Sequence, residues 1–550
     1  MRAKIISSLE KCFLDETVFS KPQLKEFSML KNEKYSFQMC FDTEHVPYCR
    51  DIFTYEINSP LKDYISVYKV QNIPSNLPVC PNGYDEKYLR TEPGLYPDLL
   101  QPTDENDHFT IKHNLLALWF EIDTKGQVEA GTYPIKITLK EVKDKEPKTL
   151  ELTVTAEIIN AELPKLDLYH SRWFYPDCLA QYYNVEMYSE RHWQIIENFL
   201  MNAVKYGQNT VLTPIISPEL DTYVGGYRPS TQLVGITLEN GKYSFDFSKL
   251  NRWVDLCDKV GIKYFEIGHF FTQWGFTACP QVYVNVNGEE VRMFDWDTPV
   301  DDKYIEFLTA LVPAVLDFMK TKNGADKRCF FHISDEPAKE HLEEYKKFSE
   351  KIKPLFKGLP VMDALSDYCF YESGAVDIPI TAIDHIEPFI EKKVDNLFAY
   401  YCSAQHKEVS NCFFSMPSPR TRIIGAQLYK YDIKGFLTWG YNFYNSQLSY
   451  SQINPFICSD SESAFPSGDA YIVYPGTNGI PWPSLRQLVF YDALQDIMAF
   501  KLCEKLYNRD FVMNLIEDGI EPLTFKQYPC RADYILNLRE KVNKAIKEKI

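Results

Sequence analysis

Between residues 166 and 505, short strand-like segments alternate with longer segments whose apolar residues have helical spacing. Strands that alternate with helices run parallel and are joined by crossover helices. Eight repeats over about 340 residues predict a (β/α)8 TIM-like barrel with large insertions. An open doubly wound sheet is the alternative, but no Gly-rich phosphate loop follows the first strand. The eight expected strands are 166–173, 210–216, 263–270, 328–334, 359–365, 378–384, 397–402 and 435–442.

The first part of the chain, residues 1–162, has a different pattern. Runs such as YISVYKV, GTYPIKITLK and KTLELTVTAEII are rich in β-branched and aromatic residues, and several alternate with period two. This pattern predicts an N-terminal β-sandwich domain that ends at the linker NAELPKL. We therefore expect a multidomain β and α/β chain: a sandwich (1–162), a catalytic barrel (163–505) and a C-terminal helical tail (506–550).

Charge and cysteine usage exclude several classes of protein. A net charge of -17 disfavours nucleic acid and anionic membranes, and no apolar run approaches the roughly 20 residues of a membrane-spanning helix. The 14 cysteines form no CxxC pair, and the N-terminus MRAKIISSLEKCFLDE lacks a long apolar run. We therefore expect a cytoplasmic protein with reduced thiols and no signal peptide. No metal spacing such as HExxH occurs, so neither a metal nor a cofactor is expected, and homo-oligomerisation stays open.

Two adjacent acids, Asp335 and Glu336, follow the fourth expected strand in RCFFHISDEPAKEHLEEY (328–345). One interpretation is a helix start, with Asp as the N-cap, Pro just inside the helix and Glu near the positive end of its dipole. The other is an acid/base pair. Active sites of such barrels lie at the carboxyl ends of the strands, which favours the second interpretation.

Adjacent acids indicate a particular glycosidase mechanism. Neighbouring strand residues face opposite ways, so both acids reach one ligand only if the strand breaks, and Pro337 disfavours helical geometry at Glu336. Ordinary retaining glycosidases set two carboxyl groups about 5 Å apart on different segments. A neighbouring pair instead suits attack by the 2-acetamido oxygen of the substrate. Asp335 would then orient the acetamide and stabilise the developing charge, and Glu336 would protonate the leaving oxygen and later activate water.

Further candidates for binding follow the other strands, and acids, aromatics and amides together suit a carbohydrate. Tyr400 and Tyr401 point to opposite sides of a strand, so only one should face the ligand. Each candidate also has a structural interpretation: His269 as a core histidine, Trp439 as a plug of the barrel mouth, Asp221 as a turn cap. The expected substrate-binding residues are His170, Arg172, Asp221, Arg228, His269, Tyr400, Tyr401, Trp439 and Tyr441. Gln273, Trp274, Asp363, Asp367, Asp384, His385 and Asn442 lie at the same expected face.

Four blocks, FHISDEP, TPIISPELDTYVGG, GFLTWGYNFY and PSGDAYIVYPG, together resemble glycoside hydrolase family 123. The resemblance covers about residues 50 to 500. It implies a sandwich followed by a barrel, a β-N-acetylgalactosaminidase activity, and the catalytic Asp and Glu roles for Asp335 and Glu336. The acetamide-pocket tyrosine of the family would correspond to Tyr400 or Tyr401. One departure is LQDIM at 494–498, where relatives often carry a Glu-Asp-Tyr-Glu-like helix; we expect it to alter helix contacts and not the chemistry.

The resulting hypothesis is a retaining exo-β-N-acetylgalactosaminidase that removes terminal β-GalNAc from glycans by substrate-assisted catalysis. A β-N-acetylhexosaminidase acting on GlcNAc is the first alternative. A non-catalytic glycan-binding protein built on a decayed barrel is the second. The expected partner in each case is a carbohydrate.

Overall fold

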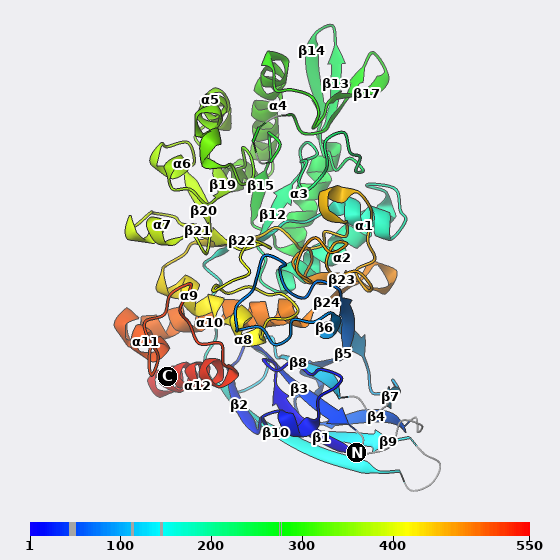
Figure 1. The fold of residues 1–550 in the computed structure, drawn as a ribbon, viewed down its shortest axis with the longest axis vertical. Helices are drawn as coiled ribbons and strands as arrows, with labels where there is room; N and C mark the ends of the chain where they lie inside the picture. Colours follow the sequence, from blue (N-terminus) through cyan, green and yellow to red (C-terminus); the bar gives the residue numbers. More distant parts are fainter. Residues whose placement is uncertain (43–50, 112–114, 143–146, 274, 277) are drawn as a thin grey trace.

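The computed structural model describes residues 1–42, 51–111, 115–142, 147–273, 275–276 and 278–550. The N-terminal region consists of two five-stranded sheets (Figure 1). In the order of pairing, the first contains β1 (Arg2–Ser7), β3 (Lys34–Asp42), β8 (Leu116–Asp123), β5 (Ile65–Ser75) and β6 (Gly94–Thr103). The second contains β2 (Glu26–Leu30), β10 (Thr149–Ile159), β9 (Gly131–Glu141), β4 (Asp51–Asn58) and β7 (Phe109–Ile111).

The two N-terminal sheets share one apolar core because their strands alternate in polarity. In β9, Ile135, Ile137 and Leu139 are buried while the residues between them are partly exposed. Phe37 of β3 stacks on Phe120 of β8 inside this core, with ring centroids 5.0 Å apart. The period-two pattern in the sequence therefore reports which face of each strand is buried.

Eight parallel strands form the second part of the chain, a nearly closed barrel. They are β11 (Tyr169–Arg172), β12 (Thr210–Thr213), β15 (Tyr264–Ile267), β18 (Cys329–Phe331), β19 (Met362–Leu365), β20 (Ile378–Ala382), β21 (Phe398–Tyr400) and β22 (Gly435–Thr438). The ring closes where β22 pairs with β11, and an isolated parallel bridge between Phe331 and Val361 joins β18 to β19. Each strand lies inside one of the eight segments expected from the sequence. A β-rich region followed by an eight-stranded parallel barrel is therefore confirmed.

Helices follow the barrel strands and cover the barrel on its outside (Figure 1). They are α1 (Pro176–Tyr182), α2 (Glu190–Lys205), α3 (Ser248–Val260), α4 (Asp302–Thr321), α5 (Leu342–Ile352), α6 (Cys369–Glu372), α7 (Glu387–Glu391), α8 (Ser418–Arg422), α9 (Ile424–Lys430) and α10 (Leu485–Leu506). Short 3₁₀ turns span Val18–Ser20, Lys62–Tyr64, Ala325–Arg328, Lys339–His341, Lys353–Phe356, Gln447–Ser449 and Thr477–Gly479. In α2, Ser189 caps the first turn by accepting from the His192 N–H, and one apolar face is buried.

Insertions after the second and third barrel strands form a separate small sheet. It contains β14 (Lys242–Asp246), β13 (Gly235–Glu239), β16 (Val282–Val286) and β17 (Glu289–Phe294), and it lies at the top of Figure 1. A two-stranded ribbon, β23 (Val473–Pro475) with β24 (Pro481–Pro483), follows the last barrel strand. Long loops therefore gather around the barrel and shape its surface.

The chain after residue 506 carries two helices, α11 (Arg509–Ile516) and α12 (Ala532–Lys549), which pack beside α10 (Figure 1). Arg539 of α12 forms a buried ion pair with Glu33 at 2.7 Å, so this segment also contacts the N-terminal sheets. In the divergent stretch of α10, Gln495 binds the backbone of Lys34, and Asp496 pairs with an arginine of α8. The domain boundaries at 162/163 and 505/506 stay predictions.

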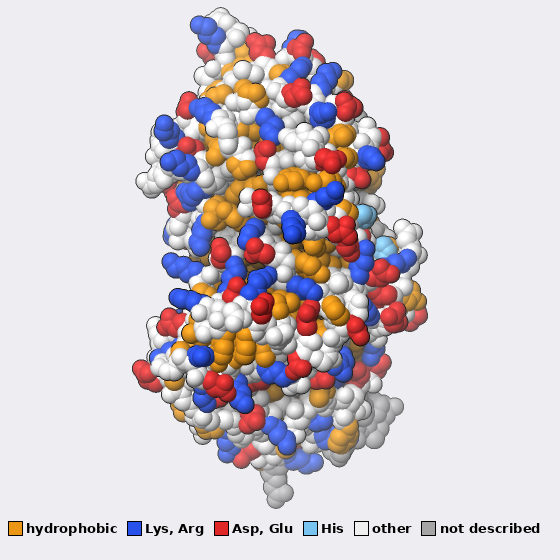
Figure 2. Space-filling model, turned by 90° about the vertical axis from the view of Figure 1, so that its left-hand side faces the viewer, with side chains coloured by type: hydrophobic (Ala, Val, Ile, Leu, Met, Phe, Trp, Pro, Cys, Tyr) orange, Lys and Arg blue, Asp and Glu red, His pale blue; other side chains and the backbone are white. Residues whose placement is uncertain are grey.

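Side chains of both charges are interspersed over the surface shown in Figure 2. Among the described residues, none of the helices combines the length and the apolar character needed to cross a bilayer.

Candidate active site

The backbone breaks away from the sheet just after β18, and a side chain of β19 holds the break in place. Asp363 accepts hydrogen bonds from the N–H groups of Ile333 (3.0 Å) and Ser334 (3.4 Å). The carbonyl of Ala364 then accepts the N–H of Glu336 at 3.1 Å. Glu336 has a φ of +45°, outside the extended and right-handed helical regions. The alternation of strand side chains therefore stops before the two acids.

Asp335 and Glu336 do not begin a helix. The first helical turn starts at Lys339, its N-cap residue is Ala338, and it has no side-chain capping bond. The α5 helix begins at Leu342, several residues beyond the acids. The capping interpretation therefore does not describe this pair.

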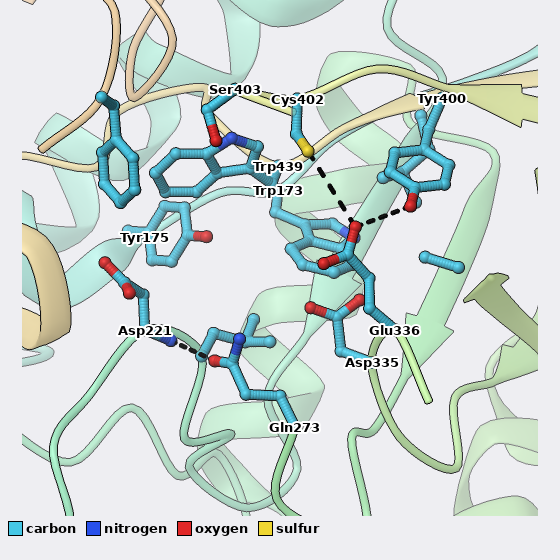
Figure 3. Close-up of a pocket in the computed structure, with 14 residues that line it drawn as sticks. Trp173, Tyr175, Asp221, Gln273, Asp335, Glu336, Tyr400, Cys402, Ser403 and Trp439 are labelled. Atoms are coloured by element: carbon cyan, nitrogen blue, oxygen red, sulfur yellow. Dashed lines mark hydrogen bonds between the residues drawn. The ribbon is translucent and has the colours of Figure 1, made fainter. Parts of the chain in front are cut away.

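Both carboxyl groups instead line a pocket at the carboxyl ends of the barrel strands (Figure 3). In Figure 3 the two side chains extend side by side toward the same cavity, although they are consecutive in the chain. The pocket is lined by Trp173, Tyr175, Leu220, Asp221, Gln273, Asp335, Glu336, Ala364, Tyr400, Cys402, Ser403, Leu437, Trp439 and Phe465.

Asp335 is the more deeply placed acid, with only 8% of its surface exposed. Burial, followed by the negative charges of Glu336, Asp363 and Glu219, raises the pKa of Asp335 well above its usual value. Two carboxyl groups in such surroundings resist simultaneous ionisation. The pair is therefore suited to hold a proton in the free pocket.

Glu336 is oriented by a tyrosine from the seventh strand. The Tyr400 hydroxyl donates to Glu336 Oε1 at 2.6 Å, and the Cys402 thiol lies 3.9 Å from the same oxygen (Figure 3). Tyr401 does not line the pocket; its ring packs edge-on against Phe436, with centroids 5.0 Å apart. Of the two tyrosines left open by the sequence, Tyr400 is the one that faces the cavity.

Aromatic rings supply much of the pocket wall. Trp439 is fixed by its indole N–H, which donates to Asp469 at 2.9 Å. Tyr175 is fixed through its backbone, because the Asn442 amide binds both its N–H and its C=O at 2.9 Å. The buried Tyr175 hydroxyl has no hydrogen-bond partner among the described residues. Flat rings with free polar tips are the surfaces that sugars bind.

A third acid, Asp221, lies across the pocket from the pair (Figure 3). Its backbone, at a φ of +49°, donates to the side-chain oxygen of Gln273, and Gln273 N–H donates to Glu219 at 3.1 Å. Asp221 Oδ2 is buried and has no partner among the described residues. Burial raises the pKa of Asp221 to about 6 and that of Glu219 to about 7. Asp221 is therefore available to accept a hydrogen bond from a ligand hydroxyl.

The structure places His170 and Arg172 outside the pocket lining. The His170 ring packs against Phe490 at 5.1 Å, and burial lowers its pKa to about 3. The Arg172 guanidinium lies over the same phenyl ring, 4.5 Å from its centroid. Both side chains belong to the packing between β11 and α10.

Arg228 and Tyr441 also lie away from the pocket lining. Arg228 forms a buried two-point ion pair with Asp177 of α1, at 2.8 and 2.7 Å, and so fixes the loop that carries Asp221. The Tyr441 hydroxyl donates to the Phe199 carbonyl at 2.8 Å. The contacts of these two side chains anchor loops and helices.

His269 is buried beneath the pocket, against Trp173 and stacked on His332 with ring centroids 4.7 Å apart. In the described part of the chain, the potential ligand atoms of His269, His332 and Asp363 lie within 4.8 Å of one another. The Asp363 oxygens already accept from backbone N–H groups and from Tyr345, which suits a scaffold better than a metal ligand.

Several pocket residues were not singled out for binding from the sequence. They include Tyr175, Cys402, Ser403 and Phe465. Asp469, from the block PSGDAYIVYPG, is not a lining residue but holds Trp439 from behind, and burial raises its pKa to about 7. Asp367, Asp384 and His385 line a separate groove beyond the fifth and sixth strands, and Trp274 lies outside the described residues.

A nearly closed parallel barrel with paired carboxyl groups and aromatic walls at the carboxyl ends of its strands is the architecture of a glycosidase. Residues 173–503 match the family model "Glycoside hydrolase 123, catalytic domain". The chain therefore belongs to glycoside hydrolase family 123.

The comparison with solved structures agrees with this family at the level of the fold. A family 123 glycoside hydrolase from Clostridium perfringens, studied for glycolipid glycan hydrolysis, is similar with a TM-score of 0.75 at 16% identity, covering 100% of this chain and 98% of that one. A β-glucuronidase from Parabacteroides merdae has a TM-score of 0.33 at 11% identity, covering 84% and 50%. A family 5 mannosidase from Rhizomucor miehei has a TM-score of 0.35 at 12% identity, covering 60% and 93%. No curated protein matches the chain significantly.

Proposed function

We propose that the protein is a retaining exo-β-N-acetylgalactosaminidase that hydrolyses terminal β-GalNAc from glycans with assistance from the substrate's 2-acetamido group. The observation that carries this proposal is the placement of two consecutive carboxyl groups, Asp335 and Glu336, in one aromatic-walled pocket. Membership of family 123 and the fold shared with a hydrolase of glycolipid glycans support the carbohydrate substrate.

In the first step, the acetamido carbonyl oxygen attacks the anomeric carbon while the bond from that carbon to the leaving oxygen breaks. The single proton of the carboxyl pair is on Glu336 in the reactive complex, and Glu336 transfers it to the leaving oxygen while Asp335 is ionised. Asp335 accepts a hydrogen bond from the acetamide N–H and stabilises the positive charge of the cyclic intermediate. The product is an oxazolinium ion, and Glu336 is left as a carboxylate.

In the second step, Glu336 takes a proton from water, and the water oxygen attacks the anomeric carbon on the face from which the leaving group departed. The bond from the anomeric carbon to the acetamido oxygen breaks, and the acetamide is restored. Two inversions at the same carbon give net retention. Tyr400 keeps Glu336 aimed at the same region of the pocket in both steps.

The test uses variants of the two acids and two kinds of substrate. Glu336→Gln should lose nearly all activity on glycans with poor leaving groups and retain more on aryl glycosides, which need little protonation. Asp335→Asn should lose activity on both, since the acetamide is no longer oriented. Hydrolysis of unactivated substrates by both variants at the wild-type rate would refute the proposal.

The two alternatives are separated by substrate and turnover. A panel of nitrophenyl glycosides distinguishes GalNAc from GlcNAc specificity. Loss of turnover on a glycoside without the 2-acetamido group supports substrate assistance for either sugar. Tight sugar binding without any turnover would favour a glycan-binding protein. The Asp221 Oδ2 atom, which has no partner among the described residues and can accept from a sugar hydroxyl, is compatible with all three.

We further propose that the protein acts in the cytoplasm, in accord with its singly scattered cysteines. Fractionation of the native cells with an antibody against the chain tests this location.

A further inference from the structure

Two tyrosines from different barrel loops form a stacked pair close to the pocket. Tyr223 belongs to the loop after β12, and Tyr450 belongs to the loop after β22. Their ring centroids are 4.6 Å apart and the rings are nearly parallel, at 19°. Both loops leave the carboxyl ends of barrel strands, the face at which the pocket lies.

The stacked pair is tied directly to a pocket residue. The Ser449 hydroxyl donates to the carbonyl of Asp221 at 2.8 Å, and Tyr223 N–H donates to the Leu448 carbonyl at 3.0 Å. Asp221 lines the pocket and stands two residues before Tyr223. The aromatic pair is therefore a fixed part of the pocket rim.

The backbone of both loops is compatible with the stacked tyrosine pair. A side chain at Gly226 would meet the Tyr223 ring at 2.9 Å, so glycine leaves room for the ring. Leu448 and Ser449 both have a φ of +53°, a conformation that residues with side chains adopt at an energetic cost. The loop thus holds Tyr450 in place through a strained turn rather than through burial.

The outer side of Tyr450 remains open to solvent. Tyr450 is 66% exposed although one face of its ring is covered by Tyr223. Exposed aromatic surface next to a site of binding marks a place for a ligand. Tyr227 of the same rim, also 66% exposed, adds to this surface.

We propose that Tyr450, supported from behind by Tyr223, is a stacking platform for a second sugar ring of the same glycan, outside the pocket. This inference rests on the proposed function, since it extends the pocket to an oligosaccharide. The C–H face of a neutral sugar packs on the open face of an aromatic ring, and its hydroxyl groups stay hydrated. The platform therefore selects glycans over simple glycosides of the same terminal sugar.

The experiment compares two substrates in the full-length protein: a β-GalNAc-terminated tetrasaccharide and methyl β-GalNAc, each followed by release of free GalNAc. Tyr450→Ala should lower kcat/KM for the tetrasaccharide about 3- to 10-fold and leave the methyl glycoside within about twofold. Tyr450→Phe, which keeps the ring, should restore the wild-type ratio. Tyr84→Ala removes another tyrosine that is 52% exposed, in the N-terminal region, and serves as the matched control.

An equal loss on both substrates, or no loss on either, would overturn the platform. Failure of the wild type to hydrolyse both substrates would instead refute the proposed function. In that event, calorimetric titration of the wild type and of Tyr450→Ala with the tetrasaccharide still decides the inference. Weaker binding by the variant supports the platform, and equal affinity excludes it.

Discussion

The hydrogen bond from Tyr400 to Glu336 makes a quantitative prediction for Tyr400→Phe. The bond is 2.6 Å long, Glu336 becomes a carboxylate during the proposed reaction, and hydrogen bonds to charged groups contribute about 1.5–3 kcal/mol. Glu336 is only partly buried, so water replaces some of this contribution in the variant. A net loss of about 1.5–2 kcal/mol corresponds to a roughly 10- to 30-fold lower kcat/KM.

The assay is initial-rate hydrolysis of an unactivated β-GalNAc disaccharide. We expect the decrease in kcat, with KM nearly unchanged, because the hydroxyl orients Glu336 and does not hold the sugar. The phenyl ring preserves the packing of a side chain that is 4% exposed, so thermal unfolding should shift little. Tyr401→Phe is the matched control, since Tyr401 lies outside the pocket lining and the loss of its hydroxyl should leave kcat close to wild type.

Three results would refute this reasoning. If Tyr400→Phe retained kcat within about twofold of wild type, the orientation of Glu336 would not limit the reaction. If KM alone rose, the Tyr400 hydroxyl would bind the substrate directly. A loss of equal size in Tyr401→Phe would show that the effect comes from packing of the seventh strand.

Two further predictions concern charge in the pocket. The raised pKa of Asp335 means that its ionised form destabilises the folded state. Asp335→Asn should therefore unfold at a higher temperature than wild type at neutral pH. This difference in unfolding temperature should shrink as pH falls toward about 4, because the carboxyl of the unfolded wild type then also binds a proton. Calorimetric scans across pH would contradict this if the variant were less stable than wild type at pH 7. Asp221, Asp335 and Glu336 line the pocket, and none of its described lining residues is basic. A sulfate on the terminal sugar should therefore lower kcat/KM by about 100-fold relative to the unsulfated glycan. This factor corresponds to a repulsion of about 3 kcal/mol between the sulfate and one carboxylate at about 5 Å and an effective dielectric constant of about 20. Equal rates on the two glycans, measured by release of the sugar, would exclude this charge selection.

The architecture was predictable because it depends on repeated local patterns. Each barrel strand is short and largely buried and a helix follows it, and eight repeats of that pattern leave few arrangements. The β10 strand of the N-terminal sheets also follows a local pattern, because every second residue, Val154, Ala156 and Ile158, is buried. These signals lie within ten or twenty residues and need no knowledge of the tertiary structure.

The site was predictable only in part, because position on the barrel face does not fix the direction of a side chain. His170 and Arg172 stand at the end of β11, yet both pack against Phe490 of α10, which is more than 300 residues away in sequence. Tyr175 enters the pocket because Asn442, from the last barrel loop, binds its backbone. Such contacts between distant segments leave no local signal in a single sequence.

Two consecutive acids share one pocket because of the backbone conformation after β18. A continued strand would direct Asp335 and Glu336 to opposite sides, one into the barrel and one toward the helices. The Asp363 carboxyl takes over the N–H groups of Ile333 and Ser334, so the chain leaves the sheet early and turns at Glu336. A buried acid is costly to keep, and Asp363 is itself buried with a raised pKa caused first by desolvation. The fold therefore uses one buried acid, Asp363, to shape the backbone so that two others share a pocket.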